Sequence, residues 1–314
     1  MLYNKIGDFM EQNNLIPPFL NELLDKEYGI ELKNKIIEGY KNNRLTTLRV
    51  NTIKSNKEAI IKFFNDNNIE FKEGPIDNSF ILLNKTANDL YKTDIVENGL
   101  VYLQSLSSML PPIYLEPMEG EDILDMAAAP GGKTSEIAAL TNNKAHITAV
   151  EIDKIRCDRL KFNILKQGAS SVFVINTDAK RLDDYFSFNK ILLDAPCSGS
   201  GTLFLNEKTK QLKISRELVK NSAKLQTELL KKALKILKPN SYMIYSTCSI
   251  LKEENENVLN KVLPLYNCEI VKLDPMDLET LPSTIPGVIT VMPNEYYEGF
   301  FIAKIYKKKG LLRN

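Results

Sequence analysis

Apolar positions follow two different patterns along this 314-residue chain. From about residue 119 onward, short apolar runs alternate with stretches in which apolar residues recur every three or four positions, which indicates strands joined by helices. The expected strands lie at 122–126, 146–152, 172–176, 190–194, 242–247 and 299–305. The expected helices lie at 134–140, 156–167 and 225–237, and a Lys-Pro-Asn turn at 238–240 ends the last one. This order predicts an α/β fold with a doubly wound, mostly parallel sheet.

The pattern before residue 105 is different. It consists of helical pieces, an extended run at 47–52, a helix at 57–67 and short strands at 69–72 and 80–83. This mixture predicts a smaller N-terminal α+β module at 1–104, followed by the larger domain at 105–314. A helix expected at 105–115 could pack against either part.

Composition places the chain among globular proteins, with 43% hydrophobic and 26% charged residues. No apolar stretch reaches the roughly 18–20 residues of a membrane span, and the N-terminus lacks the basic-then-apolar order of a signal peptide. We therefore expect a cytoplasmic protein that does not bind membranes.

The cysteines and the one histidine limit the possible chemistry. Cys157, Cys197, Cys248 and Cys268 form no CxxC pair, and only His146 could complete a tetrahedral site, so no metal is expected. A single histidine also argues against Ser-His-Asp and Cys-His catalysis. Because His146 lies in the apolar run 145–150, we expect it to be a packed strand residue.

Basic residues concentrate in one segment although the net charge is only +1. Residues 207–238 hold ten Lys or Arg against three Glu. Such a run is either the solvated face of a helix or a phosphate-binding face, and both interpretations stay open.

The strongest local motif is Asp-Met-Ala-Ala-Ala-Pro-Gly-Gly-Lys-Thr at 125–134, where a strand turns through glycines into a helix. Glycines allow a ligand to approach the backbone, and a helix N-terminus favours an anionic group, so the motif indicates a nucleotide or nucleoside cofactor. The GxGxxG of a dinucleotide site is absent. A P-loop nucleotidase is the alternative, because Gly132-Lys133-Thr134 and a Walker-B-like Asp194 are present, but Ala127 stands where the first P-loop glycine belongs.

S-adenosylmethionine fits this motif better, because acids recur at the end of each strand that follows. Glu151 can accept hydrogen bonds from both ribose hydroxyls, and Asp178 lies where an adenine amino group is expected. Together with Asp125 and Asp194, these acids map to the carboxyl edge of the sheet, where doubly wound folds bind ligands.

Two cysteines follow neighbouring strands at that same edge. Cys197 comes three residues after Asp194, and Cys248 directly follows the expected strand 242–247. Carbon 5 of cytosine accepts a methyl group only after a thiolate adds to carbon 6, which cysteine can supply if a cation such as Lys133 lowers its pKa. Asp194 can accept a hydrogen bond from the cytosine amino group, which uracil lacks. The plainer alternative is a pair of cysteines that act as small buried hydrophobes.

These motifs, taken in order, resemble the Sun/Fmu-type RNA cytosine-5 methyltransferases, whose fold is a Rossmann-like methyltransferase sheet. The resemblance rests on segments 49–52, 102–112, 125–134, 194–201, 246–249 and 299–304. It implies that Cys248 is the nucleophile, that Cys197 assists product release, and that Lys133 and Asp194 engage the base. It implies S-adenosylmethionine binding by Ala127, Ala128, Ala129, Pro130, Gly131, Gly132, Lys133, Glu151, Arg156, Asp178 and Asp194.

The resemblance also implies a substrate. The chain departs from the family pattern after Asn206-Glu207, at 238–241 and at 293–297, where a histidine is missing, and these departures concern substrate contacts. Its length resembles the compact archaeal-type members that act on tRNA, so we expect a monomer that modifies tRNA, with ribosomal RNA as the alternative. RNA is expected to bind to the N-terminal module and to the basic run from Lys208 to Lys238, with help from Arg49 and the tail 307–309.

Overall fold

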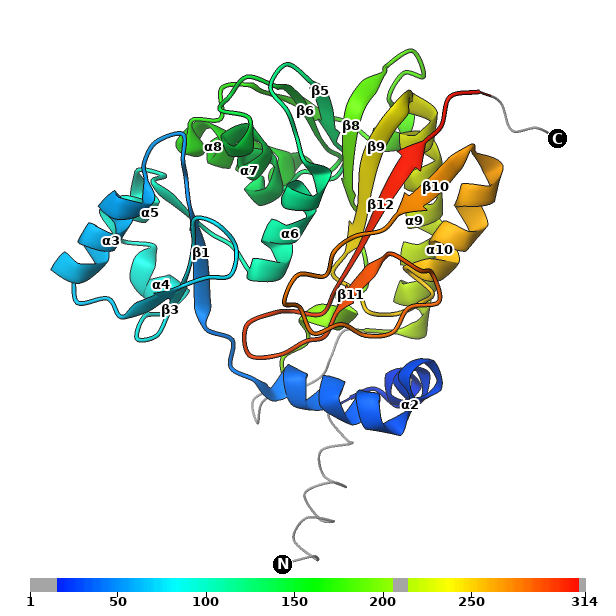
Figure 1. The fold of residues 1–314 in the computed structure, drawn as a ribbon, viewed down its shortest axis with the longest axis horizontal. Helices are drawn as coiled ribbons and strands as arrows, with labels where there is room; N and C mark the ends of the chain where they lie inside the picture. The colour runs from blue at the N-terminus through cyan, green and yellow to red at the C-terminus, as the bar shows by residue number, and fades with distance from the viewer. Residues whose placement is uncertain (1–15, 206–213, 311–314) are drawn as a thin grey trace, which may run out of the picture.

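The computed structural model describes residues 16–205 and 214–310 (Figure 1). Its larger sheet has the strand order β10-β12-β9-β8-β5-β6-β7, and β11 pairs with β12. Strands β5 to β9 pair in parallel, whereas β10, β11 and β12 pair in antiparallel fashion. Their bounds are β5 Asp122–Asp125, β6 His146–Glu151, β7 Val172–Asn176, β8 Phe188–Asp194, β9 Leu237–Thr247, β10 Cys268–Val271, β11 Ile289–Val291 and β12 Phe300–Lys307.

Helices cover both faces of this sheet. One face carries α6 (Leu106–Leu115), α7 (Gly132–Leu140) and α8 (Lys154–Gln167), and the other carries α9 (Arg216–Ile236) and α10 (Glu256–Val262). Successive strand residues point to opposite faces, so that Leu192 packs in the core under α6 and α7 while Leu193 packs in the core under α9. The predicted doubly wound, mostly parallel α/β sheet is confirmed, and α6 packs on it.

A second, four-stranded antiparallel sheet lies beside the first (Figure 1). It consists of β1 (Thr46–Val50), β2 (Phe71–Glu73), β3 (Ser79–Leu82) and β4 (Val101–Leu103) in the order β2-β3-β1-β4. Phe64 of α3 (Lys57–Asp66) packs on Phe80 with ring centroids 5.3 Å apart. The short helices α4 (Ala87–Leu90) and α5 (Asp94–Glu97) complete this α+β module.

Helix α2 (Pro18–Lys41) packs away from that small sheet. Its Leu20 and Leu24 share a core with residues 203, 250 and 292 of the larger domain. The hydroxyl of Tyr40 donates a hydrogen bond to the Ser200 carbonyl at 2.6 Å, and Tyr28 donates one to the Ile250 carbonyl. The first described segment of the chain is therefore held against loops that carry the cysteine motifs.

Several sequence expectations were wrong in detail. Helix α9 begins at Arg216, nine residues before the expected start, because its first turns bury only Val219 and Ser222 and show little periodicity. The expected turn at 238–240 belongs to β9, where only Asn240 has a left-handed φ of 58°, which asparagine tolerates. The His146 side chain is 78% exposed at the start of β6 and is not packed.

No helix in the described ranges is both long and apolar enough to cross a membrane. The segments outside regular strands and α-helices include three single 3₁₀ turns, η1 (Ala179–Arg181), η2 (Ser200–Thr202) and η3 (Leu263–Leu265).

Arg49 joins the small sheet to the start of α7. Its guanidinium donates to the side chain of Gln104 at 2.9 Å, to the Gly132 carbonyl at 3.0 Å and to the Ser135 hydroxyl at 2.7 Å. It also lies 3.8 Å from the Glu136 carboxylate, and both side chains are buried. The expectation that Arg49 contacts RNA is therefore wrong, because its donors are used inside the protein.

Replacing Arg49 should make stability more dependent on pH. Burial already raises the pKa of Glu136 to about 7, and Arg49 opposes this rise. Because the folded carboxyl holds its proton more tightly than the unfolded one, stability falls as pH increases above the unfolded pKa. Arg49→Met should cost about 3–5 kcal/mol at pH 8 and clearly less at pH 5, measured by urea unfolding.

The control is the double variant Arg49→Met/Glu136→Gln, which lacks the buried charge. It should recover part of the stability at pH 8 and lack the additional pH dependence that Arg49→Met introduces. Equal destabilisation at both pH values, with no recovery, would contradict this account of the network.

Candidate active site

The parallel strands deliver their terminal residues to one edge of the sheet. Asp125 ends β5, Glu151 ends β6 and Asp194 ends β8, while Asp178 follows β7 by two residues and Cys248 directly follows β9. The chain leaves β5 for β6 and β7 and returns to β8 beside β5. This reversal is the switch point where doubly wound sheets bind ligands.

The loop 127–131 turns the chain from β5 into α7. Gly131 caps the helix with a φ of 107°, and a Cβ there would lie 3.0 Å from the Leu160 side chain, so only glycine fits without strain. The Thr134 hydroxyl donates to Asp125 at 2.7 Å inside the protein. A P-loop needs this hydroxyl for Mg²⁺, so the geometry argues against the nucleotidase alternative.

A cleft of about 690 Å³ opens at this edge. It is lined by Asp125, residues 127–130, Gly132, Lys133 and Asp194, among others. Burial raises the pKa of Asp125 to about 6, and its Oδ1 atom has no hydrogen-bond partner among the described residues. An unpartnered buried carboxyl oxygen beside the cleft suits a cationic ligand group, such as the amine or sulfonium of S-adenosylmethionine.

The remaining predicted cofactor residues lie along the same edge but do not line that cleft. Arg156 donates to the Ala129 carbonyl at 2.9 Å and lies 3.5 Å from the buried Glu151 carboxylate. Glu151 also accepts a hydrogen bond from the Asp153 backbone at 2.9 Å. Asp178 accepts one from the Lys180 backbone at 3.0 Å. These residues could hold the sugar and base of a nucleoside while the cleft holds its charged end.

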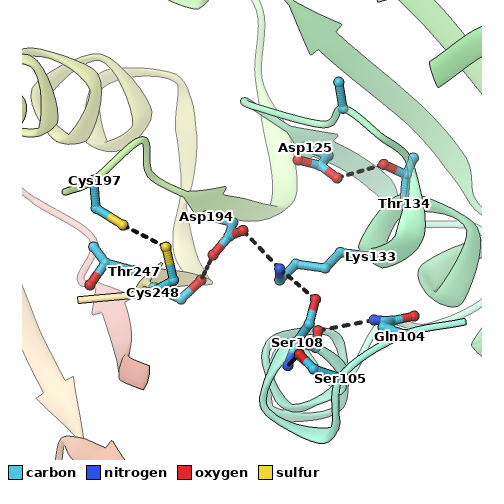
Figure 2. A network of polar contacts seen from close by, with 12 residues as sticks. Gln104, Ser105, Ser108, Asp125, Lys133, Thr134, Asp194, Cys197, Thr247 and Cys248 are labelled. Carbon is cyan, nitrogen blue, oxygen red and sulfur yellow. Dashed lines mark hydrogen bonds and ion pairs between the residues drawn. The ribbon is translucent and has the colours of Figure 1, made fainter. Parts of the chain in front are cut away.

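Lys133 connects the cofactor loop to β8 (Figure 2). Its ammonium lies 2.8 Å from Asp194 Oδ2 and donates to the Ser108 hydroxyl at 2.8 Å. The Ser246 hydroxyl donates to the other Asp194 oxygen at 2.7 Å. Burial alone would lower the pKa of Lys133, but the ion pair with Asp194 raises it overall, so the lysine stays charged.

The two cysteines are brought together as predicted, and Figure 2 shows them next to Asp194. Cys197 Sγ and Cys248 Sγ lie 2.8 Å apart, in direct contact, and either thiol could be the hydrogen-bond donor. The hydrogen bond to Cys248 and burial raise the pKa of Cys197 well above its ordinary value. Cys197 is therefore a protonated thiol at neutral pH.

Glu254 is a site residue that the sequence did not point to. Its fully buried carboxylate accepts from the Ser198 backbone at 2.7 Å and from the Ser198 and Ser249 hydroxyls at 2.6 Å each. It thus ties the loop after Cys197 to the loop after Cys248. The residue lies in the polar run 252–257, which is typical of an exposed turn, so no sequence signal indicates its burial.

Three lysines of the basic run are paired with acids. Lys232 pairs with Asp184 at 2.5 Å, Lys235 pairs with the same carboxylate, and Lys238 pairs with Asp122 at 3.0 Å. In the tail, Lys307 donates to carbonyls at the end of α9. Lys208, Lys210 and Lys213 lie outside the described residues. RNA binding by the basic run 207–238 stays a prediction. Fewer of its lysines are free of acidic partners than the sequence suggests.

The sheet order, the glycine loop and the strand-end acids define a Rossmann-like methyltransferase. The family model of 16S rRNA methyltransferase RsmB/F matches residues 112–306. The ribosomal RNA small subunit methyltransferase F of Shewanella loihica is 33% identical over 288 residues, covering 85% of this chain and 57% of that protein. This chain belongs to the RsmB/F family.

Two further proteins extend the comparison. The 26S rRNA (cytosine-C(5))-methyltransferase nsun-1 of Caenorhabditis elegans is 38% identical over 179 residues, covering 55% of this chain and 27% of that protein. A solved methyltransferase homologue from Pyrococcus horikoshii is 32% identical with a TM-score of 0.82, covering 93% of this chain and 95% of that one. This chain spans little more than half the length of the Shewanella relative, of which 57% is covered. The predicted Sun/Fmu-type family and its cofactor, S-adenosylmethionine, are confirmed.

Removal of Cys248 should make Cys197 more acidic. The hydrogen bond that the Cys197 thiol donates to Cys248 is the largest cause of the raised pKa of Cys197, so Cys248→Ala should shift the pH midpoint of Cys197 alkylation by iodoacetamide to lower pH. Peptide mass spectrometry at several pH values measures this midpoint.

Cys268 is the internal control, since burial raises its pKa to about 11 and it lies on β10, apart from the site. Its alkylation profile should be the same in both proteins. An unchanged midpoint for Cys197, even with a faster rate, would mean that the variant altered access and not acidity.

Proposed function

We propose that this protein transfers a methyl group from S-adenosylmethionine to carbon 5 of a cytosine in RNA, through a covalent adduct with Cys248. The observation that carries the proposal is the pair of thiols 2.8 Å apart beside the Lys133–Asp194 ion pair, at the cofactor edge of a methyltransferase sheet. A methyltransferase acting on oxygen or nitrogen needs no thiol here, whereas carbon 5 of cytosine does.

We take Cys248 as the nucleophile, as the resemblance to the Sun/Fmu-type enzymes implies, and Cys197, whose pKa is raised by the hydrogen bond with Cys248 and by burial, as the thiol that stays protonated. The Cys248 sulfur, as a thiolate, forms a bond to carbon 6, and carbon 5 then attacks the methyl group, whose bond to the sulfonium sulfur of its donor breaks. S-adenosylmethionine, when bound, supplies that methyl. Loss of the carbon 5 proton to a base restores the double bond between carbons 5 and 6, and the bond from carbon 6 to sulfur breaks. Cys197, in contact with the departing sulfur, assists this last step.

Asp194 and Lys133 hold the base. Each Asp194 oxygen accepts one hydrogen bond from the protein, from Lys133 or from Ser246, and a carboxylate has further lone pairs for the cytosine amino group. Lys133, 2.8 Å from the carboxylate, holds it in position for the ring. This arrangement favours cytosine over uracil, which would present a carbonyl oxygen to the carboxylate.

We propose tRNA as the substrate, with ribosomal RNA as the alternative. The choice of tRNA rests on the resemblance to compact archaeal-type members that act on tRNA, whereas the Shewanella loihica relative is named for ribosomal RNA. Transfer of a tritiated methyl group to total tRNA or to small-subunit ribosomal RNA, each isolated from cells lacking the enzyme, distinguishes them. Labelling of the ribosomal RNA alone would overturn the tRNA proposal.

The two cysteines should fail in different ways. Cys248→Ala should lose methyl transfer by on the order of 10⁴-fold and form no adduct, because the covalent step is gone. In Cys197→Ala, Cys248 should still attack the base and the base should still be methylated, but release of the product should stop. The protein then stays joined to RNA and runs as a slow band on a denaturing gel.

The double variant Cys197→Ala/Cys248→Ala is the control and should give no band. If Cys248→Ala accumulates the adduct while Cys197→Ala is inert, the roles of the cysteines are reversed. If neither variant loses transfer, the covalent mechanism is wrong.

A further inference from the structure

The cleft continues past the cofactor loop, away from the two cysteines. Beyond Pro130 its walls are formed by α8 on one side and the N-terminal module on the other. Arg159, Phe162 and Lys166 line it from α8, and Tyr91 lines it from the end of α4. We call this part of the cleft the outer arm.

The α8 residues of the outer arm lie on one helix face, since they are spaced three and four positions apart. Phe162 is 62% exposed, and the ammonium of Lys166 lies 6.0 Å from its ring centroid. Tyr91 is 59% exposed. Large exposed aromatic rings on both walls of a cleft are surfaces on which a flat ligand can stack.

The cations of the outer arm are available for an anionic ligand. Among the described residues, neither Arg159 nor Lys166 forms an ion pair with an acid, in contrast to Lys232 and Lys235 on α9. The acids of the cleft, Asp125 and Asp194, lie at its inner end. The cleft is therefore acidic where a base and a cationic cofactor group are expected, and basic at its outer end.

We propose that the outer arm binds a nucleotide adjacent to the target cytosine in single-stranded RNA. Arg159 and Lys166 bind the phosphate, and the base stacks on Phe162 or Tyr91. Aromatic faces combined with cations are the usual means of binding single-stranded nucleic acid. The proposal rests on the proposed function for the identity of the substrate, but it concerns a surface that the chemistry itself does not use.

Binding of a fluorescein-labelled single-stranded RNA with one cytosine, followed by anisotropy at several salt concentrations, tests the outer arm. Arg159→Gln/Lys166→Gln should weaken binding and flatten its dependence on salt. The log–log slope should fall by about 0.7 for each phosphate that the variant no longer neutralises. Phe162→Ala should weaken binding roughly 5- to 150-fold, the range expected when one base can no longer stack.

Matched controls come from the same chain. Lys154→Gln/Lys161→Gln removes two cations from α8 that do not line the cleft, and Tyr185→Ala removes a ring that is 95% exposed elsewhere. Both should bind RNA as the parent does. Stabilisation by S-adenosylhomocysteine, followed by thermal shift, should be the same in all of these proteins.

If the outer-arm variants bind RNA with the same affinity and the same salt dependence as the parent protein, the proposal is wrong. So would an equal weakening of S-adenosylhomocysteine binding, because the arm would then belong to the cofactor. If the parent protein transfers no methyl group but the variants still lose RNA affinity, the proposed function is wrong and RNA binding by the outer arm is supported. If the parent neither methylates nor binds RNA, both fall.

Discussion

The ion pair between Lys133 and Asp194 is the interaction on which the site depends. Lys133 belongs to the first turn of α7, directly after the glycine loop, and Asp194 ends β8, which leads into the loop that carries Cys197. Their 2.8 Å contact bridges the two strands at the switch point and joins the cofactor loop to the cysteine loop. Side chains from α6 and β9 complete it, so that four segments distant in sequence share one charged cluster.

A second carboxylate, that of Glu254, holds the two loops that carry the cysteines. Glu254 is fully buried, and burial raises its pKa, which its bonds to Ser198 and Ser249 oppose. A buried acid of this kind costs stability unless its hydrogen bonds are satisfied. Here they fix the backbone after each cysteine. Close backbone packing also holds the loop after Cys197 in place. A Cβ on Gly201 would lie 1.9 Å from the Gly299 carbonyl oxygen, so only glycine fits there.

The sequence predicted the large sheet well because its strands are continuous apolar runs that end in acids or cysteines. Asp125, Glu151, Asp194 and Cys248 were placed correctly since parallel strands share a carboxyl edge. The short strands β10 and β11 were missed, because three or four residues carry too little periodicity. The burial of Arg49 and Glu254 was missed for another reason. A charged residue becomes internal only through partners from distant segments, which no local pattern reveals.

Trapping with 5-fluorocytidine tests the central claim most directly. Fluorine at carbon 5 cannot leave as a proton does, so the attacking cysteine stays bonded to carbon 6 after methyl transfer. An RNA carrying this base, incubated with the protein and S-adenosylmethionine and then digested, should yield one methylated nucleotide adduct on the peptide that contains Cys248. An adduct on the peptide that contains Cys197, or a methylated RNA that is released without any adduct, would contradict the account.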